Sequence, residues 1–366
     1  MTIDVRRITA DDAAWLAALQ GTRHDVYHLP CYADAIAKHE RGHAQLWIAS
    51  DATTSSKVIL PLIVQPVSLD AATHEGGTDH VDASSPYNYG SPLVSTAAER
   101  RHVQELWREL ERQLHNAGFV SLFLRMNPYL PFPTEQTFSP HEVVHHGRTV
   151  AVDLNASVDE LWRRIRKRTK PKVNGLHREG FFLRRTDASG IERFEAMYRN
   201  HMQRLGASER YFFGVAHFYL LAENCGDAFE LYEVIGPTGE TVAAAIFLVY
   251  DGVANYHLSA THADFVDRSP ISLLLWDAIK TFSSRGLRYV HLGGGRGGEE
   301  DSLFHFKTGF GKELMPFSTV RLVLNERAYA NACAERGITS FDDRAGFFPA
   351  YRAKNPSSNG ARSGTG

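Results

Sequence analysis

The stretch SPISLLLWDAIKTFSSRGLRYVHLGG, residues 269–294, predicts a helix followed by a buried strand. Pro270 stands at the first helical position, where a missing backbone N–H leaves no hydrogen bond unmade. Gly286 stands where a helix commonly ends in a left-handed residue. The apolar run LRYVHL then reads as a strand, so the stretch predicts helix, glycine and strand in that order.

The same order of elements occurs earlier in the chain. Residues 97–116 predict a helix that ends at Gly118, and FVSLFLRM follows as a buried strand. Apolar residues recur in this helix at helical spacing: Val103, Leu106, Trp107, Leu110 and Leu114. Trp107 precedes Gly118 by eleven residues, and Trp276 precedes Gly286 by ten.

Three strand-like segments, FELYEVI, TVAAAIFLVY and VANYHLSAT, precede the second helix. The turns GPTGE and DG join them, which predicts an antiparallel meander. We therefore predict an α+β protein made of two copies of one unit, each a mixed, mostly antiparallel sheet flanked by helices.

The remaining segments complete the predicted organisation. We expect helices near residues 11–19, 31–39 and 326–337, and strands at 44–49, 58–65 and 317–324. The proline-rich PYLPFPTEQTFSP, residues 128–140, predicts an extended linker between the copies. The expected divisions are a first unit at 1–147, a second at 148–316, a segment at 317–340 returning to the first unit, and a disordered tail at 351–366.

The composition is that of a soluble globular protein, with 43% hydrophobic and 22% charged residues among 366. Forty basic and 42 acidic residues nearly balance, so attraction to a polyanion requires a local patch. The cysteines Cys31, Cys225 and Cys333 are far apart in the sequence, which argues against a disulfide scaffold or a zinc ribbon and fits a reducing cytoplasm. Without an apolar N-terminal run or eighteen successive apolar residues, we expect neither a secretion signal nor a membrane span.

Residues 141–145, HEVVH, match the H-E-x-x-H pattern of zinc proteases. That chemistry needs both histidines on one face of a sustained helix, with Glu160 the residue at a distance where a third ligand would be sought. The pattern instead lies between Pro140 and Gly147 and runs into the strand-like TVAVDL. We therefore predict a strand with exposed histidines and no metal site.

The stretch HLGGGRGGEEDSLFHFKTGFG, residues 291–311, contains a literal G-x-G-x-x-G. A dinucleotide site would need a long helix after the glycines. Three carboxylates follow instead, Glu299, Glu300 and Asp301, where they would repel a pyrophosphate. A flexible turn is the simpler interpretation of the glycines.

Lys307 follows the glycines, between aromatic neighbours. Its ammonium either reaches solvent along the aromatic surface or is held inside to neutralise developing negative charge. The residues alone leave both alternatives open.

The segment WRRIRKRTKPKVNG is the one strong charge run in the sequence, with seven cations between positions 163 and 172. A run of this kind holds a polyphosphate or an RNA backbone, or else it is a solvated helix face.

In order along the chain, SPYNYGSPL, TVAVDLN, IRKRTKPKVN, ELYEVI, NYHLSAT and finally LGGG with LFHFKTGFG resemble the Fem family. Members of this family are aminoacyl-tRNA-dependent peptidyltransferases, and the resemblance covers about residues 20 to 325. It implies two acetyltransferase-like (GNAT) units side by side, in agreement with the duplication.

The resemblance also implies roles for single residues. Lys307 would stabilise the oxyanion of acyl transfer, and Phe306 would line the same pocket. Tyr256 would contact the acceptor. The expected phosphate contacts are Lys170 and Lys172, together with Arg166 and Lys167 of the same basic run.

A basic residue of the first unit matches the family less well, because CYADAIAKH offers only Lys38. This departure points away from the UDP-linked peptidoglycan precursor that the family usually accepts. Further candidates carry an alternative each: Tyr211 lines the acceptor channel or belongs to the core, and Arg268 contacts phosphate or lies on an exposed loop. His257, Asp301 or the substrate itself would take up the proton of the attacking amine.

The loop THADFVDRSPIS has two aspartates and no glycine, whereas an acyl-CoA-dependent GNAT wraps the CoA pyrophosphate with a glycine-bearing turn there. The loop therefore disfavours acetyl-CoA as the donor. The resemblance implies aminoacyl-tRNA as the co-substrate, no cofactor, and a small amine-bearing acceptor such as an antibiotic-like peptide, an aminosugar or a cell-wall precursor. No Ser-His-Asp or Cys-His arrangement is visible, so the amine is expected to attack directly. An acetyl-CoA-dependent N-acyltransferase and a non-catalytic GNAT-like binding module are the alternatives.

Overall fold

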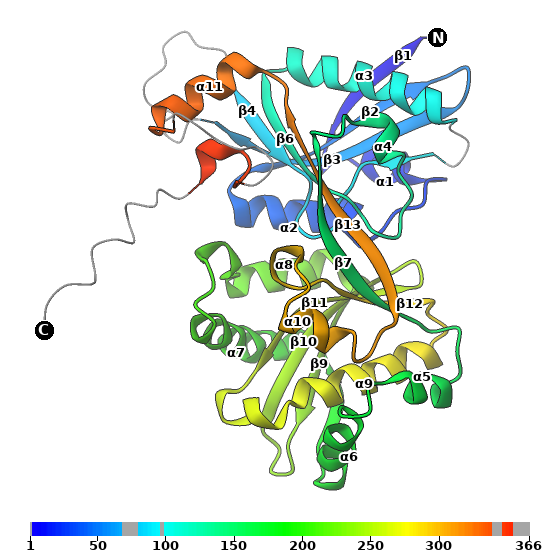
Figure 1. Cartoon of the computed structure of the whole chain (residues 1–366), viewed down its shortest axis with the longest axis vertical. Helices are drawn as coiled ribbons and strands as arrows, with labels where there is room; N and C mark the ends of the chain where they lie inside the picture. The colour runs from blue at the N-terminus through cyan, green and yellow to red at the C-terminus, as the bar shows by residue number, and fades with distance from the viewer. Residues whose placement is uncertain (1, 68–79, 96–98, 339–345, 354–366) are drawn as a thin grey trace, which may run out of the picture.

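The computed structural model describes residues 2–67, 80–95, 99–338 and 346–353, and within them the chain forms two halves stacked along its long axis (Figure 1). The first half contains β1 (Ile3–Thr9), α1 (Ala14–Leu19), α2 (Pro30–Glu40), β2 (His43–Asp51), β3 (Ser56–Pro66), β4 (Val81–Ser84), β5 (Leu93–Val94), α3 (Arg100–Asn116), β6 (Phe119–Arg125) and α4 (Thr134–Thr137). The strand β7 (Val143–Asp153) leads into the second half.

The second half begins with two short helices and continues into its own sheet. It contains α5 (Val158–Arg164), α6 (Lys170–Arg178), β8 (Phe182–Thr186), α7 (Ile191–Arg204), α8 (Val215–Cys225), β9 (Phe229–Ile235), β10 (Thr241–Tyr250), β11 (Val253–Thr261), α9 (Pro270–Ser284), β12 (Tyr289–Gly293) and α10 (Ser302–Lys307). The chain then returns to the first half through β13 (Glu313–Val323) and α11 (Glu326–Glu335). Among the described residues, no helix is long and apolar enough to cross a membrane.

The two halves repeat one topology, so the predicted duplication is confirmed. In the first half β2, β3 and β4 are antiparallel neighbours, and β6 returns through α3 to lie parallel to β4. In the second half β9, β10 and β11 are antiparallel neighbours, and β12 returns through α9 to lie parallel to β11. Each half is therefore the mixed, mostly antiparallel α+β unit that the sequence predicts.

The strand that follows each closing strand crosses to the other half. β7 follows β6 in the chain but pairs with β12, placing Ala151 opposite His291. β13 follows β12 but pairs with β6, placing Thr319 opposite Arg125. β7 and β13 also pair with each other, so one continuous sheet runs through both halves. Residue 147, the predicted end of the first unit, lies inside β7.

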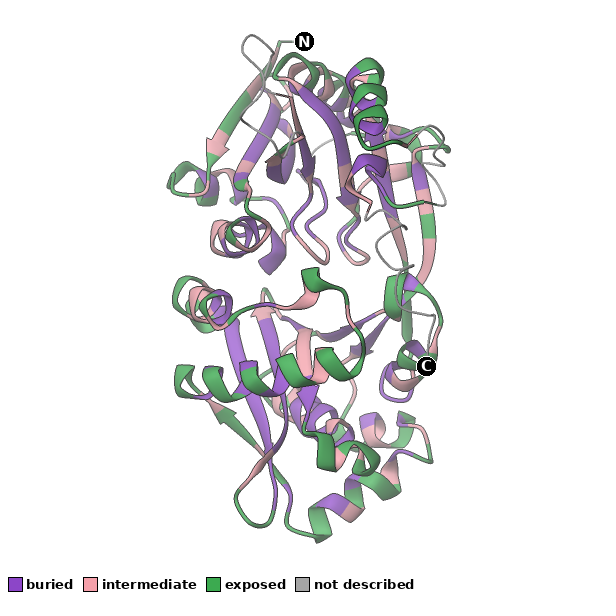
Figure 2. Cartoon of the chain, turned by 90° about the vertical axis from the view of Figure 1, so that its left-hand side faces the viewer, coloured by how far each residue is buried: buried purple, intermediate pink, exposed green. Residues whose placement is uncertain are grey.

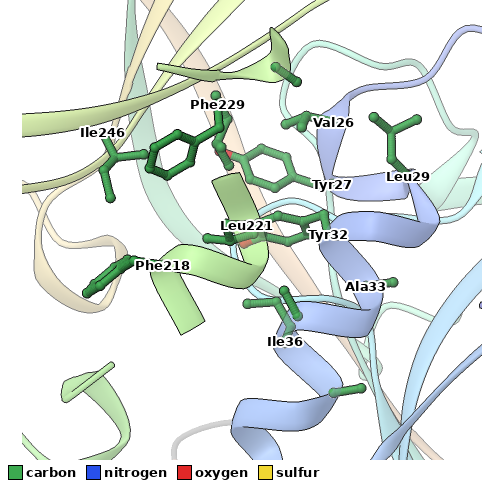
Figure 3. Packing of buried hydrophobic residues seen from close by; sticks show 14 of the residues in the cluster. Val26, Tyr27, Leu29, Tyr32, Ala33, Ile36, Phe218, Leu221, Phe229 and Ile246 are labelled. Atoms are coloured by element: carbon green, nitrogen blue, oxygen red, sulfur yellow. The ribbon is translucent and has the colours of Figure 1, made fainter. Parts of the chain in front are cut away.

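Buried residues line the strands of the sheet in both halves, whereas the outer faces of the covering helices are exposed (Figure 2). Trp107 of α3 and Trp276 of α9 belong to two separate cores, one in each half. A third core joins the halves. In that cluster Tyr32 and Ile36 of α2 lie with Phe218 and Leu221 of α8 (Figure 3).

The segment 128–140 is not an extended linker, and that prediction is wrong. It contains α4, and Phe132 and Phe138 pack their rings against Trp107, with centroids 6.2 and 4.8 Å from the tryptophan ring. Two phenylalanines bring enough apolar surface to hold a proline-rich segment on the first half.

The predicted disordered tail also begins too early. Tyr351 is buried, and its hydroxyl donates to Asp82 at 2.8 Å. Arg352 donates to the same carboxylate at 2.6 Å. Residues 354–366 of the predicted tail, and residues 97 and 98 of the helix predicted at 97–116, lie outside the described residues.

Replacing Phe138 by alanine tests the packing of the 128–140 segment. We expect Phe138→Ala to lower the free energy of unfolding by about 3–5 kcal/mol, because it empties a buried ring site beside Trp107. The matched control is Phe347→Ala, since Phe347 is 48% exposed, and its effect should stay within about 0.5 kcal/mol. Urea denaturation measures both. Equal, small effects would contradict the packing.

Candidate active site between the two halves

Lys307 is a buried lysine at the end of α10. Its side chain is held inside, because the residue is only 8% exposed and Nζ donates to the backbone oxygen of Gly294 at 2.6 Å. Burial lowers its pKa to about 8, and the nearby carboxylate of Asp301 acts in the opposite direction. An ammonium held this way has spare N–H donors for a second, negatively charged acceptor.

Gly293, the last residue of β12, makes room for this lysine. A Cβ at this position would lie 3.4 Å from Lys307 Nζ and 3.2 Å from the hydroxyl oxygen of Tyr89. Gly293 also has a φ of +74°, which side chains rarely adopt. The glycine run therefore brings a tyrosine of the first half and a lysine of the second half to the same piece of backbone.

The acids after the glycines stabilise the local structure. Asp301 caps α10, since one carboxylate oxygen accepts from the backbone N–H of Phe304 and the other from Arg296 Nε, both at 3.0 Å. Glu300 pairs with Arg148 at 2.7 Å. Their placement agrees with the interpretation that this glycine turn does not bind a pyrophosphate.

A buried polar network joins the halves close to this point. Asp25 of the first half is 2% exposed, and its carboxylate accepts from Asn255 Nδ2 at 3.1 Å and from the hydroxyl of Tyr129. The Tyr129 hydroxyl also lies 2.9 Å from Asn255 Oδ1. Burial raises the pKa of Asp25 to about 6, although these hydrogen bonds lower it.

His291 lies beside Asn255 on the neighbouring strand, β12. It is 2% exposed, its ring centroid is 4.9 Å from that of Tyr89 and 5.3 Å from that of Tyr129, and Nε2 has no hydrogen-bond partner in the described part of the chain. Burial and the charge of Lys307 lower its pKa to about 3, so the imidazole is neutral. Sequence reasoning missed His291, although it lies only two residues before Gly293, where the glycine run begins.

His257 provides a second neutral imidazole at the boundary between the halves. Its Nδ1 lies 3.0 Å from Nδ2 of Asn88 in the first half, and its ring centroid is 5.9 Å from that of Tyr32. Burial lowers its pKa to about 3. Within the described residues Nε2 has no hydrogen-bond partner.

Tyr256 and Phe306 pack elsewhere, against the core that surrounds α9. The hydroxyl of Tyr256 donates to Ser259, and burial raises its pKa to about 12. The neighbours Asn255 and His257 instead contact residues of the first half, because successive strand residues face opposite sides. Of these predicted residues, His257 therefore lies at the boundary, whereas Tyr256 belongs to the opposite face of β11.

Three further predicted residues have partners of their own. Lys38 is exposed on α2 and pairs with Asp34 at 2.7 Å on the same helix. Arg268 pairs with Glu179 and lies over the ring of Phe181. Tyr211, at the end of a short 3-10 helix (Glu209–Tyr211), is partly buried with its ring centroid 6.5 Å from that of Tyr87 in the first half.

The basic run follows α5, the turn after it and α6. Its seven cations form the basic ridge: Arg163, Arg164, Arg166, Lys167, Arg168, Lys170 and Lys172. At one end Arg166 donates through Nη2 to Thr308, the residue after Lys307, at 3.0 Å. At the other end Lys172 Nζ donates to Ser269, at the start of α9, at 3.0 Å. The ridge therefore extends from the Lys307 loop to the N-terminus of α9.

A surface hollow of about 670 Å³ lies on the ridge. The residues that line it are Lys167, Lys170, Pro171, Asn174, His177 and Arg178. The cations among them, Lys167, Lys170 and Arg178, can bind phosphate groups.

The last three residues of the H-E-x-x-H pattern belong to a strand, as predicted, whereas His141 and Glu142 lie in the turn before it. β7 begins at Val143, and His141 and His145 are exposed. No cluster of three or more histidine, cysteine or acidic side chains that could hold a metal ion occurs within the described ranges.

Comparison with known proteins defines the class of protein. Residues 163–308 match the model of the acetyltransferase (GNAT) domain. Among solved structures, the chain is similar to FemX, with a TM-score of 0.65 at 13% identity over 90% of this chain and 99% of that one. The chain therefore has the tandem GNAT fold. Within that class its fold is Fem-like.

Two other solved structures share the fold at lower similarity. L-PGS from Bacillus licheniformis has a TM-score of 0.52 and 11% identity over 85% of this chain and 92% of that one. A protein of unknown function from Bacteroides thetaiotaomicron has a TM-score of 0.51 and 10% identity over 88% and 100%. No curated protein sequence matches the chain. The GNAT domain and the tandem fold support an acyltransferase as the class of enzyme.

Substitution of Gly293 tests the packing around Lys307. We expect Gly293→Ala to destabilise the protein by more than the roughly 1 kcal/mol that a left-handed backbone costs alanine, because the new methyl group also meets Tyr89 and Lys307. Lys307 should then be acylated faster by acetic anhydride, as measured by peptide mass spectrometry. The control is Gly206→Ala, where φ is +60° and no atom lies within 4 Å of the new Cβ. Equal lysine labelling in both variants would contradict the packing.

Proposed function

We propose that the protein is an aminoacyltransferase that moves an amino acid from the 3′-terminal ester of an aminoacyl-tRNA to the amine of a small acceptor. The observation that carries the proposal is the buried ammonium of Lys307, held at Gly294 beside the boundary of the two halves. An ester carbonyl placed there becomes an oxyanion next to a positive charge in a water-poor site.

The reaction needs alignment, charge relief and loss of one proton. The acceptor amine attacks the ester carbonyl, a tetrahedral oxyanion forms next to Lys307, and its collapse breaks the ester bond and releases the tRNA 3′-hydroxyl group. The proton lost by the amine nitrogen passes to a neutral group or to the leaving oxygen. Asp301 suits this role poorly, because both of its oxygens already accept hydrogen bonds within the α10 cap. His291 suits it better, because its imidazole is neutral and its Nε2 has no hydrogen-bond partner in the described part of the chain. In His257 the Nδ1 atom accepts from Asn88 Nδ2, so its Nε2 carries the ring proton and can only donate.

The basic ridge supports tRNA as the donor. Arg166 donates to Thr308, the residue after Lys307, and Lys167 and Lys170 line the hollow on α6. A phosphate backbone can be bound along these cations. Arg166, Lys167, Lys170 and Lys172 are the proposed contacts.

The connection between β11 and α9 argues against a CoA donor. It is a 3-10 helix (Ala263–Arg268) with Asp264 and Asp267 and without glycine, and α9 begins at Pro270. Backbone N–H groups at that helix start would otherwise bind a pyrophosphate. Arg268, the basic residue of this connection, is paired with Glu179.

The proposed acceptor is an amine of a peptide or aminosugar natural product, or of a peptidoglycan precursor. Lys38, the residue expected to meet the family's usual precursor, is paired on the surface of α2, which supports an acceptor of the first kind. Incubation of the protein with mixed aminoacyl-tRNAs and candidate acceptors, followed by mass spectrometry, should show an acceptor heavier by one aminoacyl group. Turnover with acetyl-CoA alone would overturn the proposal, and no transfer from any donor would favour a binding module.

Loss of the Lys307 charge should slow transfer strongly. We expect Lys307→Ala to lower kcat about 100- to 1,000-fold, the usual effect of removing one oxyanion donor. Lys312→Ala is the control, since Lys312 is exposed and its Nζ donates to the backbone of Thr308. Single-turnover transfer from charged tRNA measures both. A Lys307→Ala variant as fast as Lys312→Ala would remove Lys307 from the mechanism.

The pH dependence of transfer should report the same lysine. Because the pKa of Lys307 is lowered to about 8, the ammonium is present below that pH and is lost as pH rises through it. The rate should therefore fall above about pH 8. In Lys307→Arg the guanidinium stays charged, so the alkaline fall should disappear even where the rate at neutral pH is lower. An identical alkaline limb in both proteins would assign the titration to another group.

Removal of ridge charges should weaken tRNA binding in a salt-dependent manner. We expect the double variant Lys167→Ala, Lys170→Ala to bind charged tRNA more weakly and to reduce the slope of log K against log salt by about 1 to 2. The control is Arg108→Ala, Arg112→Ala, which removes two cations from a hollow of mixed charge in the first half. Filter binding at several salt concentrations measures both. Equal slopes in the two double variants would contradict the assignment of the ridge.

A further inference from the structure

Cys31 and Cys225 form a close pair of thiols across the boundary between the halves. They lie 194 residues apart in the sequence, yet their sulfur atoms are 2.6 Å apart. Cys31 is the second residue of α2, and Cys225 is the last residue of α8. Both are partly exposed free cysteines that pack against the core joining α2 to α8.

The surroundings distinguish the two thiols. The Cys225 thiol donates to Cys31 Sγ, and this hydrogen bond, together with backbone N–H groups at the start of α2, lowers the pKa of Cys31. The same hydrogen bond and burial raise the pKa of Cys225. Cys31 lies in the first turn of α2, where the positive end of the helix dipole favours a thiolate, whereas Cys225 is the last residue of α8. These positions make Cys31 the nucleophilic member of the pair and Cys225 the resolving thiol beside it.

We propose that Cys31 and Cys225 form a redox modification site, at which a peroxide converts the two thiols into a disulfide that links the halves. The Cys31 thiolate attacks one oxygen of hydrogen peroxide and becomes a sulfenic acid; the other oxygen leaves as hydroxide and takes up a proton to form water. The Cys225 sulfur then attacks the Cys31 sulfur, loses its proton, and expels the hydroxyl group as a second water. Two thiols give up two electrons, and one peroxide accepts them.

The bond would restrain the boundary that carries the candidate active site. α2 belongs to the first half and α8 to the second, and the β7–β13 pair already connects the halves elsewhere. The link would close a long loop, and such links stabilise the folded state by restricting the unfolded chain. The oxidised protein should therefore unfold at a higher temperature than the reduced protein.

Peptide mapping tests the proposal on the full chain. The reduced protein is treated with hydrogen peroxide, quenched with catalase, unfolded, alkylated with iodoacetamide and digested. We expect loss of two of the three alkylatable thiols, with the Cys31 and Cys225 peptides joined to each other and Cys333 alkylated. Dithiothreitol should restore all three thiols and lower the Tm again.

Single serine variants provide the controls. Cys31→Ser and Cys225→Ser should form no intramolecular link and should show no peroxide-dependent rise in Tm. Three free thiols in the treated wild type, a link to Cys333, or a linked pair with an unchanged Tm would each overturn the proposal. Thiol counts and Tm require no substrate, so the outcome does not depend on the proposed aminoacyl transfer.

Discussion

The pairing of β7 with β13 is the constraint on which the arrangement of the two halves depends. Each strand leaves one half and completes the sheet of the other, so thirteen strands of the described chain form one sheet. Backbone hydrogen bonds along this pair fix the register of the halves, and the core between α2 and α8 fixes their second contact. Asp25, Tyr89 and Tyr129 of the first half thereby meet Asn255 and Lys307 of the second.

Desolvation gives the site at this boundary its chemical character. The burial that keeps His257 and His291 neutral also lowers the pKa of Lys307 toward neutrality, and it raises that of Asp25. Lys307 remains mostly charged at neutral pH, while the neutral imidazole of His291 is available as an acceptor. Direct acyl transfer requires both a cation and a proton acceptor, because the amine nitrogen loses a proton while the carbonyl oxygen gains negative charge.

Much of the fold could be predicted from the sequence because its signals are local. The bounds of β9, β10 and β11 agree with the predicted strands, and Pro270 and Gly286 mark the limits of α9. The pairing of β7 and β13 with the sheet of the opposite half could not be predicted, because neither segment alone contains a sequence pattern that identifies its distant partner strand. The packing of Phe138 on Trp107 was missed for the same reason.

The candidate site was predictable only in part. Lys307 could be predicted as a site residue from its aromatic neighbours and the family resemblance. The other residues belong to no recognisable motif and become neighbours only in the folded chain: Asp25, Tyr89, Tyr129 and His291. The proposed transfer in this protein depends on Lys307 being an ammonium buried at this boundary. An NMR titration of the lysine side-chain signals, with Lys307 assigned from the Lys307→Arg variant, tests this directly. A pKa of about 8 is expected for Lys307, and titration at the ordinary lysine value of about 10.4 would show that the ammonium is not buried.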